Sequence, residues 1–421
     1  MSKWAYQKLD EYVHTGQIEL GRGNIISKLD IDACPGPYPI YSSSAQGDGK
    51  FGEYGKFMFD EELISWSVDG GGNFFYRPKH QFSVTNVSGF LRIKTKEFGY
   101  RFLYYSLALQ HRDISFDYTT KAHPSVIRKL YSIPAIPKQE QDRIVEVLST
   151  VDEEIAQTEA LIAKYQQIKA GLMHDLFTRG VTPNGHLRPI RTQAPHLYRE
   201  SPLGWIPKEW ETIALSHVAD SLVDGPFGSN LKTEHYVVEP GVRVVRLQNI
   251  QEGIYNDEDR AFVSKRHADY LVRHTVNPGD VLVAALGEER YPVGRACCYP
   301  DDLPPSVNKA DCYRLRCKSQ YALNAYVMHF LNTENARKQV RRFEQGVTRR
   351  RMNLGNFRRV VVSQPTVEEQ RRTLDFLSSV SGHIESAKLL ASKLRQQKHG
   401  LMHDLLTGRV RVKVAEAEEK L

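Results

Sequence analysis

Two acidic stretches in the second half of the chain have the residue types of a catalytic site. Asp280, followed by Glu288-Glu289-Arg290, resembles the D...E-x-K pattern with which nucleases hold a divalent metal ion, but arginine stands where the pattern requires lysine. Asp302 begins the segment DLPPS, which resembles the D-P-P-Y motif of amino-methyltransferases, but leucine replaces the first proline and no cofactor glycine motif precedes it. Because Pro-Gly-Asp before a strand is also a common turn, we expect neither stretch to be catalytic.

Two further patterns could do chemistry. The run Gly70–Gly72 lacks the spacing of a nucleotide-binding loop and no helix follows it, so it predicts a hairpin turn. The pairs His174-Asp175 and His403-Asp404 would need additional partners to form a metal or acid–base site. We expect these pairs to have a structural role at a helix end, or to contact a partner protein.

The five cysteines match no common zinc-ligand spacing, so we expect them to be reduced and to line strands. No metal site is predicted. The cysteines are Cys34, Cys297, Cys298, Cys312 and Cys317.

A basic segment favours contact with nucleic acid. Between Arg337 and Arg359 there are nine Arg or Lys residues and one acid, Glu344. Charge runs commonly form solvated helix faces, but the core of this one, QGVTRRRMNLGNFRRV, places three arginines beside a glycine and small polar residues. Guanidinium groups on such a loop suit phosphate contacts and the acceptors of base edges.

Glycine-flexed loops elsewhere carry amide, hydroxyl and cationic side chains that match base edges in the major groove. They are YPIYSSSAQGDGKFGEYGKFMF, DGGGNFFYRPKHQF, DGPFGSNLKTEHY, VVRLQNI and LGEERYPVGRA. The candidate DNA-binding residues are Ser43, Ser44, Lys50, Tyr54, Arg77, Lys79, Lys121, Ser229, Asn230, Lys232, Arg246, Gln248, Asn249, Arg290, Tyr291, Arg295, Arg349, Arg350 and Arg351.

The chain contains an internal repeat, which predicts the long helices that position these loops. The hexapeptide GLMHDL occurs at 171–176 and again at 400–405, and the offset of 229 also aligns Glu140-Gln141 with Glu369-Gln370. Steps of four and three from Ile144 and from Thr373 each meet eight apolar or aromatic residues in ten. This heptad seam predicts two long helices, each roughly 55 Å long, that pack antiparallel on each other.

The two helices divide the chain into six parts. We predict an α+β fold with a pseudo-twofold internal repeat, in which two globular α/β domains are separated by two antiparallel coiled-coil helices. The parts are the first globular segment (1–138), the first spacer helix (139–180), an extended surface linker (181–209), the second globular segment (210–364), the second spacer helix (365–408) and a C-terminal tail (409–421).

Composition agrees with a globular protein of two or more domains. The 421 residues are 41% hydrophobic and 10% aromatic, with a formal net charge of +7. No apolar run approaches the length of a membrane span and no signal core follows the N-terminus. We expect a cytoplasmic protein without membrane contact.

This arrangement resembles the specificity subunit (HsdS) of type I restriction-modification enzymes over nearly the whole chain. The resemblance is carried by the P-x-x-E-Q and P-x-x-x-E-Q helix openings, the helix ends GLMHDLFTRG and GLMHDLLTGRV, the opening SPLGWIPKEWETIALSHVAD, and the close from QGVTRRRMNL to VVVSQPTVEEQ. The first globular segment departs from the family because it lacks the PLGWIP opening, which we interpret as a shortened N-terminus.

The resemblance implies a non-catalytic DNA-recognition subunit in which each globular segment is a target-recognition domain. It implies double-stranded DNA, two methyltransferase subunits, and restriction and translocase subunits as partners. S-adenosylmethionine, ATP and Mg are then expected only on the partner subunits, and no cofactor is expected here. Because the two segments differ in sequence, the DNA target should be split and asymmetric, with a gap that depends on helix length.

Two alternatives remain open. The chain could be a self-contained DNA methyltransferase or nuclease with built-in recognition domains, which transfer of a labelled methyl group without any partner would reveal. It could also be a coiled-coil scaffold without a role on DNA, against which strongly salt-dependent DNA binding would count.

Overall fold

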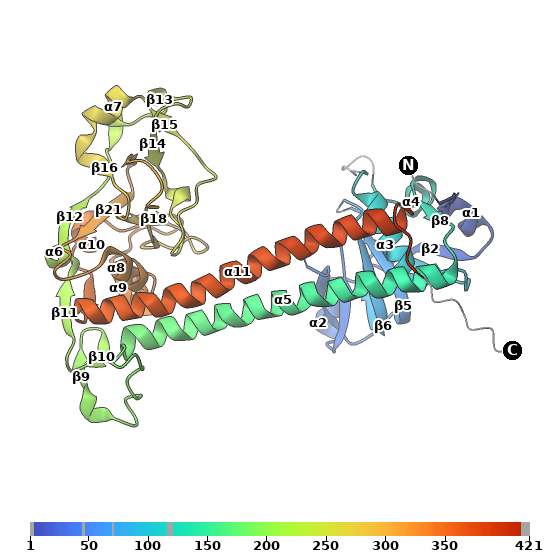
Figure 1. Ribbon diagram of the computed structural model, residues 1–421, viewed down its shortest axis with the longest axis horizontal. Coiled ribbons are helices and arrows are strands. Elements are labelled where there is room, and N and C mark those ends of the chain that lie inside the picture. The colour runs from blue at the N-terminus through green and yellow to red at the C-terminus, as the bar shows by residue number, and fades with distance from the viewer. Residues whose placement is uncertain (1–3, 44–46, 70, 115, 117–120, 414–421) are drawn as a thin grey trace. The chain divides into compact units, whose positions relative to one another are not determined.

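The structure is a computed structural model that describes residues 4–43, 47–69, 71–114, 116 and 121–413. The chain forms two compact units (Figure 1). Unit 1 comprises Met1–Leu161 and Ala387–Leu421, and unit 2 comprises Ile162–Ser386. Each unit therefore contains one globular segment and a part of both long helices. None of the described helices is long and apolar enough to cross a membrane.

The two predicted spacer helices are present as α5 (Lys138–Thr178) and α11 (Val367–Leu406). In unit 1, the Lys398 ammonium of α11 lies 2.6 Å from an Asp152 carboxylate oxygen of α5. In unit 2, the rings of Tyr165 and His383 stack with their centroids 5.4 Å apart. The apolar seam is buried, for example at Leu148 and Ala391. The heptad pattern thus identified two helices that pack together, as Figure 1 shows within each unit.

The first globular segment is built on a six-stranded sheet in the order β2-β7-β5-β6-β3-β4. Its strands are β1 (Tyr6–Lys8), β2 (Ile18–Arg22), β3 (Tyr38–Tyr41), β4 (Lys50–Tyr54), β5 (Phe59–Ser67), β6 (Phe74–Val84), β7 (Ser88–Ile93) and β8 (Ser132–Pro134). Its helices are α1 (Leu9–His14), α2 (Lys28–Ala33), α3 (Tyr100–His111) and α4 (Pro124–Leu130).

The antiparallel pair β5 and β6 forms the centre of that sheet. Gly71 and Gly72, between these strands, have positive φ values of 92° and 83°, as the predicted hairpin turn requires; Gly70 lies outside the described residues. Helix α3 packs on β5 and β6. The indole of Trp66, which is 1% exposed, donates a hydrogen bond to the Ala122 carbonyl at 2.7 Å, so the polar atom of this core side chain is satisfied.

The second globular segment contains a four-stranded sheet (β12-β21-β17-β19), a five-stranded sheet (β13-β15-β14-β20-β16) and two short pairs, β11-β23 and β18-β22. Its strands are β11 (Glu211–Ala214), β12 (Ala219–Val223), β13 (Tyr236–Val237), β14 (Val242–Val245), β15 (Phe262–Val263), β16 (Thr275–Val276), β17 (Val281–Ala284), β18 (Leu286–Gly287), β19 (Ala296–Cys298), β20 (Ser306–Asn308), β21 (Cys312–Cys317), β22 (Arg350–Arg351) and β23 (Val361–Gln364). Its helices are α6 (Leu215–Val218), η2 (Gly228–Asn230), η3 (Thr233–His235), η4 (Leu247–Asn249), α7 (Lys265–Tyr270), η5 (Val272–His274), α8 (Asn324–Leu331), α9 (Glu334–Phe343) and α10 (Leu354–Phe357).

The amphipathic segment YALNAYVMHFLNTENARKQVRRF forms two helices. Helix α8 ends at Leu331 and α9 begins at Glu334. The Thr333 hydroxyl accepts a hydrogen bond from the Ala336 N–H, so this residue caps the second helix. Threonine at such a position favours a new helix start over continuation of the first.

The internal repeat extends to the first and last strands of both globular segments. Strand β1 pairs antiparallel with β8, which leads into α5, and β11 pairs antiparallel with β23, which leads into α11. In unit 1, the Trp4 indole donates to the Leu405 carbonyl at the end of α11. In unit 2, Trp210 lies against Gly180 just after α5. Each globular segment is thus anchored at the start of one long helix and the end of the other.

The linker differs from the extended surface connection that its composition predicted. It contains η1 (Pro195–Leu197) and a hairpin of β9 (Tyr198–Ser201) with β10 (Gly204–Pro207). Arg188 is 6% exposed and its guanidinium donates to both carboxylate oxygens of Glu369, at 2.5 and 3.1 Å. Pro, Gly and Arg indicate turns, but they do not reveal that one arginine finds a buried acid 181 residues away in the sequence.

Candidate nucleic-acid interface

The second globular segment brings four of the predicted residues to one cavity of about 410 Å³, here called the loop pocket. Gln248, Tyr291, Arg295 and Arg349 come from three separate stretches of sequence. The complete lining is Leu247, Gln248, Gln251, Asn256, Leu286, Gly287, Glu288, Tyr291, Arg295 and Arg349. A pocket with a guanidinium, an amide, a carboxylate and an aromatic ring can both donate and accept hydrogen bonds.

Arg295 holds the walls of the loop pocket together. It is 5% exposed, and burial lowers the pKa of its guanidinium. Its Nε donates to the Ile250 carbonyl at 2.8 Å and its Nη2 to the Leu247 carbonyl at 3.0 Å. Its Nη1 lies 3.1–3.2 Å from the carbonyls of Leu286, Tyr291 and Pro292. Because these bonds occupy its donors, Arg295 positions the loops rather than facing a ligand.

The three consecutive arginines have different surroundings. Arg350 and Arg351 form β22, which pairs with Gly287 and Leu286 of β18. Arg350 lies 3.5 Å from a Glu344 carboxylate oxygen, and Arg351 lies 2.6 Å from an Asp311 oxygen with its guanidinium over the Phe227 ring. Arg349 is exposed and lines the loop pocket. Two of the three arginines are therefore held by acids, and the third faces the cavity.

The segment Arg246–Asn249 separates into supporting and exposed residues in the same way. Asn249 is 1% exposed; its Oδ1 accepts from the Arg246 N–H at 2.8 Å and its Nδ2 donates to the carbonyls of Asn256 and Asp259. Arg246 forms an ion pair with Asp259. The Gln248 side chain between them is exposed at the rim of the loop pocket. The buried amide of Asn249 thus fixes the turn that presents Gln248.

The other predicted residues of the second globular segment lie outside this pocket. Ser229 and Asn230 are exposed in η2, and Lys232 is exposed with its ammonium 3.7 Å from a Glu234 oxygen. The carbonyl of Asn230 is 2.8 Å from the ring of His267. Arg290 is exposed, with its guanidinium 5.4 Å from the ring centroid of Tyr291.

In the first globular segment, Arg77 is a buried support. It is 4% exposed and donates to the Ser65 hydroxyl at 2.9 Å and to the Asp48 carbonyl at 2.7 Å, while its guanidinium lies 3.5 Å from the Tyr41 ring centroid. Desolvation lowers the pKa of Arg77 to about 10. These contacts anchor the loop between β3 and β4 to β5, so Arg77 resembles Arg295 in its role.

The remaining candidates on that segment do not form one cluster with Arg77. Lys50 is exposed with its ammonium 2.8 Å from Glu53, and Lys121 is exposed with its ammonium 2.9 Å from Asp69. Lys79 is exposed on β6 and Tyr54 is half-buried on β4. The Ser43 carbonyl accepts from the Ser67 hydroxyl at 3.1 Å, and Ser44 lies outside the described residues.

Asp280, the first acid of the nuclease-like pattern, has structural contacts. Asp280 is 1% exposed, and its two carboxylate oxygens each accept a hydrogen bond from Arg316 at 2.8 Å. One of them also accepts from the Asn277 N–H, which closes the Pro-Gly-Asp turn. Within the part of the chain that the structure describes, no group of three His, Cys, Asp or Glu side chains could hold a metal ion.

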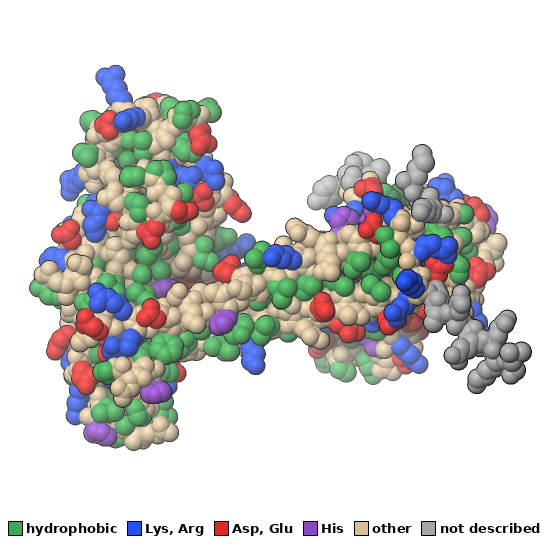
Figure 2. Space-filling view, viewed as in Figure 1, with side chains coloured by type: hydrophobic (Ala, Val, Ile, Leu, Met, Phe, Trp, Pro, Cys, Tyr) green, Lys and Arg blue, Asp and Glu red, His purple; other side chains and the backbone are tan. Residues whose placement is uncertain are grey.

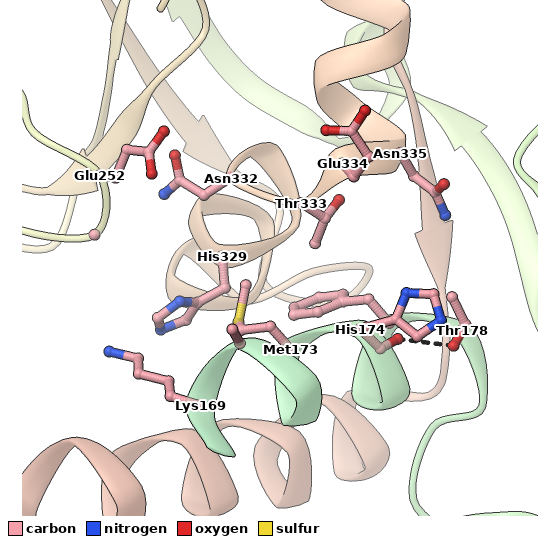
Figure 3. A pocket seen from close by; sticks show the side chains of 13 residues that line it. Lys169, Met173, His174, Thr178, Glu252, His329, Asn332, Thr333, Glu334 and Asn335 are labelled. Atoms are coloured by element: carbon pink, nitrogen blue, oxygen red, sulfur yellow. Dashed lines mark hydrogen bonds between the residues drawn. The ribbon is translucent and has the colours of Figure 1, made fainter. Parts of the chain in front are cut away.

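His174 of the repeated hexapeptide lines a second cavity of about 380 Å³, which Figure 3 shows. The figure places it beside Thr178 at the end of α5, with His329 on the opposite side. Burial and the charge of Lys169 lower the pKa of His329 to about 4. The cavity lies between the end of α5 and helices α8 and α9, and His174 is exposed in it.

Two lining residues of the loop pocket had no signal in the sequence. Gln251 and Asn256 lie outside the loops that the sequence singled out. A Cβ at Gly287 would lie 2.4 Å from the Tyr291 carbonyl oxygen, so glycine is required for this close approach of backbone. On the face shown in Figure 2, basic side chains are mixed with acidic ones, so charge alone does not mark the pocket either.

Comparison with known proteins gives consistent matches along the chain. Residues 1–168 match the family model described as the type I restriction modification DNA specificity domain. The type I restriction enzyme MjaVIII specificity subunit of Methanocaldococcus jannaschii is 24% identical over 391 residues, covering 90% of this chain and 87% of that protein. A putative type I specificity subunit N-terminus of Mycoplasma pneumoniae is 38% identical over 94 residues, covering 22% of this chain and 50% of that protein.

Solved structures share the fold. The S subunit of a type I restriction-modification system from M. genitalium has a TM-score of 0.56 at 18% identity and covers 96% of both chains. A chain from a type I system, solved to explain complex assembly and conformational transition, has a TM-score of 0.55 at 15% identity and covers 97% of this chain and 98% of that one. Residues 1–168 thus match a type I specificity domain, and most of the chain is similar in sequence and in fold to type I restriction-modification specificity subunits.

Proposed function

We propose that the chain is the DNA-reading subunit of a type I restriction-modification complex and carries no catalytic site itself. The observation that carries this proposal is the loop pocket, where Gln248, Glu288 and Arg349 line one cavity. Arg295 fixes the loops of Gln248 and Glu288, and the pairing of β18 with β22 holds the segment of Arg349. Side chains that donate and accept hydrogen bonds from a preformed surface suit base edges in the major groove.

The two globular segments would read the two halves of a split target. Their sheets differ in strand number and order, so they should read different bases and make the target asymmetric. The exposed residues predicted in both segments are the candidates for contact with bases and phosphates. They include Lys50, Lys79 and Lys121 in the first segment, and Ser229, Asn230, Lys232 and Arg290 in the second.

The repeated helix ends are the proposed places for methyltransferase subunits. Each GLMHDL copy closes one of the two long helices, and two like surfaces suit two like partners. S-adenosylmethionine, ATP and Mg would then be held by partner subunits, together with the restriction and translocase activities. The exposed His174 near the cavity in Figure 3 is one side chain that such a partner could contact.

Salt-dependent binding of DNA tests the proposal. The purified chain should shift duplex DNA that contains its target, and the association constant should fall steeply as salt rises because phosphate contacts release counterions. Replacing Arg349, Arg350 and Arg351 with Ala should weaken binding, and the slope of log K against log salt should become shallower by about one for each of Arg350 and Arg351 that contacts a phosphate.

A matched control removes equal charge elsewhere. Arg371, Lys393 and Arg395 are exposed on α11, and their replacement with Ala should leave DNA binding by the isolated chain nearly unchanged. Absence of salt-dependent binding would contradict the DNA-reading role. Transfer of a labelled methyl group from S-adenosylmethionine by the chain alone would instead identify a self-contained enzyme.

A further inference from the structure

The loop pocket has the chemistry of a base-edge site more than that of a phosphate site. Glu288 lines it together with Arg349, and both side chains are exposed at its mouth. A carboxylate there repels a phosphate but can accept a hydrogen bond from the amino group of a base. The ring of Tyr291 and the amide of Gln248 add an apolar face and a second donor and acceptor.

Of the three consecutive arginines, Arg349 is the one whose guanidinium is placed to contact a ligand in the loop pocket. Gln345 and Arg351 bond to each other through their main-chain N–H and C=O groups at 2.9 Å, so residues 345–351 form a closed hairpin that carries Arg349. Its neighbours Arg350 and Arg351 are paired with Glu344 and Asp311. For Arg349, by contrast, the described part of the chain supplies no ion pair, so its guanidinium can donate to a ligand.

The pocket is also rigid enough to discriminate. Arg295 joins the carbonyls of the turn at 247–250 to those at 286–292, and β18 pairs directly with β22 beside Arg349. Glycine at 287 allows the backbone of that wall to approach Tyr291 closely. A reading side chain on fixed supports loses little conformational entropy when it binds.

We propose that Arg349, with Gln248 and Glu288 beside it in the loop pocket, reads a guanine-containing base pair in the half of the target bound by the second globular segment. A guanidinium matches guanine because the O6 and N7 of guanine are two adjacent acceptors at the spacing of its paired donors. Glu288 can accept from the amino group of the paired cytosine. The inference rests on the proposed DNA-reading function and assigns residues and a base to it.

Selection from a randomised duplex library tests this inference with the full-length chain. The natural chain should enrich a split sequence with a guanine at one position of the part that the second globular segment reads. The Arg349→Ala variant should lose preference at that position by about tenfold or more while other positions keep theirs. The Arg349→Lys variant should also lose it, because lysine keeps the charge but not the paired donors.

Arg350→Ala is the matched control because Arg350 is the adjacent arginine and is already paired with Glu344. It should keep the guanine preference. The inference is overturned if Arg349→Ala enriches the unchanged sequence, if it weakens all positions equally as removal of a phosphate-binding charge would, or if Arg350→Ala has the same effect. A natural chain that enriches no sequence at all would overturn the proposed DNA-reading function itself.

Discussion

At the scale of single residues, the interface depends on a division between side chains that support loops and side chains that face solvent. Arg77, Asn249 and Arg295 use their polar atoms inside the protein, whereas Gln248, Arg290 and Arg349 are exposed. A buried side chain with satisfied hydrogen bonds is costly to disturb, and an exposed one is free to change. Under the proposed function, target specificity would vary through the exposed residues while the loops keep their conformation.

One half-buried acid, Asp224, gives a pH-dependent prediction. Burial raises the pKa of Asp224 from 3.8 to about 6, although its Oδ1 accepts from the N–H groups of Gly225 and Asp311. The pKa of Asp224 is therefore higher in the folded chain than in the unfolded chain. Asp224 contributes most to the free energy of unfolding below about pH 4, and this contribution is lost as the pH rises through 6.

The Asp224→Asn variant keeps the acceptor oxygen and removes the charge. At pH 8 we expect its free energy of unfolding to exceed that of the natural chain by about 1 kcal/mol, a value discounted for partial exposure of the group. The difference should disappear near pH 4. Thermal unfolding followed by calorimetry at both pH values measures it, with the exposed Asp220→Asn as control. A variant less stable at pH 8 would show that the Asp224 charge is favourable.

At the scale of elements, buried glutamates fasten the starts of the long helices. In unit 2, Glu369 accepts from the Val181 N–H at 2.8 Å, from Arg188, and from the Trp210 indole at 3.2 Å. In unit 1, the equivalent Glu140 pairs with Arg411. Glu369 thus joins α11 to the end of α5, to the linker and to Trp210, which directly precedes β11.

Loss of the Glu369 carboxylate should destabilise unit 2. In the Glu369→Ala variant, Arg188 would remain buried without its main counter-ion, although Glu209 still lies 2.7 Å away. Removing one partner of a buried ion pair typically costs about 3–5 kcal/mol, so we expect a lower midpoint of denaturant unfolding. Glu368→Ala is the control, because the Glu368 side chain is 68% exposed. Equal effects of the two changes would contradict the role assigned to Glu369.

Elements and contacts differ in how far the sequence alone could predict them. The long helices were predictable because a heptad seam over some 40 residues has few other structural solutions, and the repeat identified their ends. The different surroundings of Arg349, Arg350 and Arg351 were not predictable. Arg351 pairs with Asp311 of a distant segment, and Arg349 lines a pocket whose other residues come from distant loops. Likewise, Asn249 and Arg295 have residue types that suit base contacts, and only burial reveals them as supports.

At the scale of the whole molecule, the proposed function combines two reading segments with two long helices of fixed length. The match of residues 1–168 to a type I specificity domain, and the similarity of 90% of the chain to one specificity subunit, support the proposal that one chain serves both halves of a target. The proposal predicts that the helices determine the length of the unspecified gap and that each globular segment determines one half-site.

An insertion in both helices tests the first of these expectations. Thr158 and Ala391 are buried in the helix seam of unit 1. Seven residues inserted at each point keep the heptad register and add about 10 Å, which corresponds to about three base pairs. We expect the gap in the selected sequence to grow by about that amount. The same seven residues placed at the linker turn near Gly185 should leave the gap unchanged. An unaltered gap in the helix variant would contradict the expectation that helix length determines the gap.

The most direct measurement is a map of methylated adenines in cells that express this chain with its cognate methyltransferase subunit. The account predicts one asymmetric sequence of two parts separated by a fixed gap. When residues 210–364 are replaced by the corresponding segment of another family member, one part should change while the other part and the gap stay the same. A single continuous methylated sequence, or a replacement that alters both parts or neither, would contradict the account.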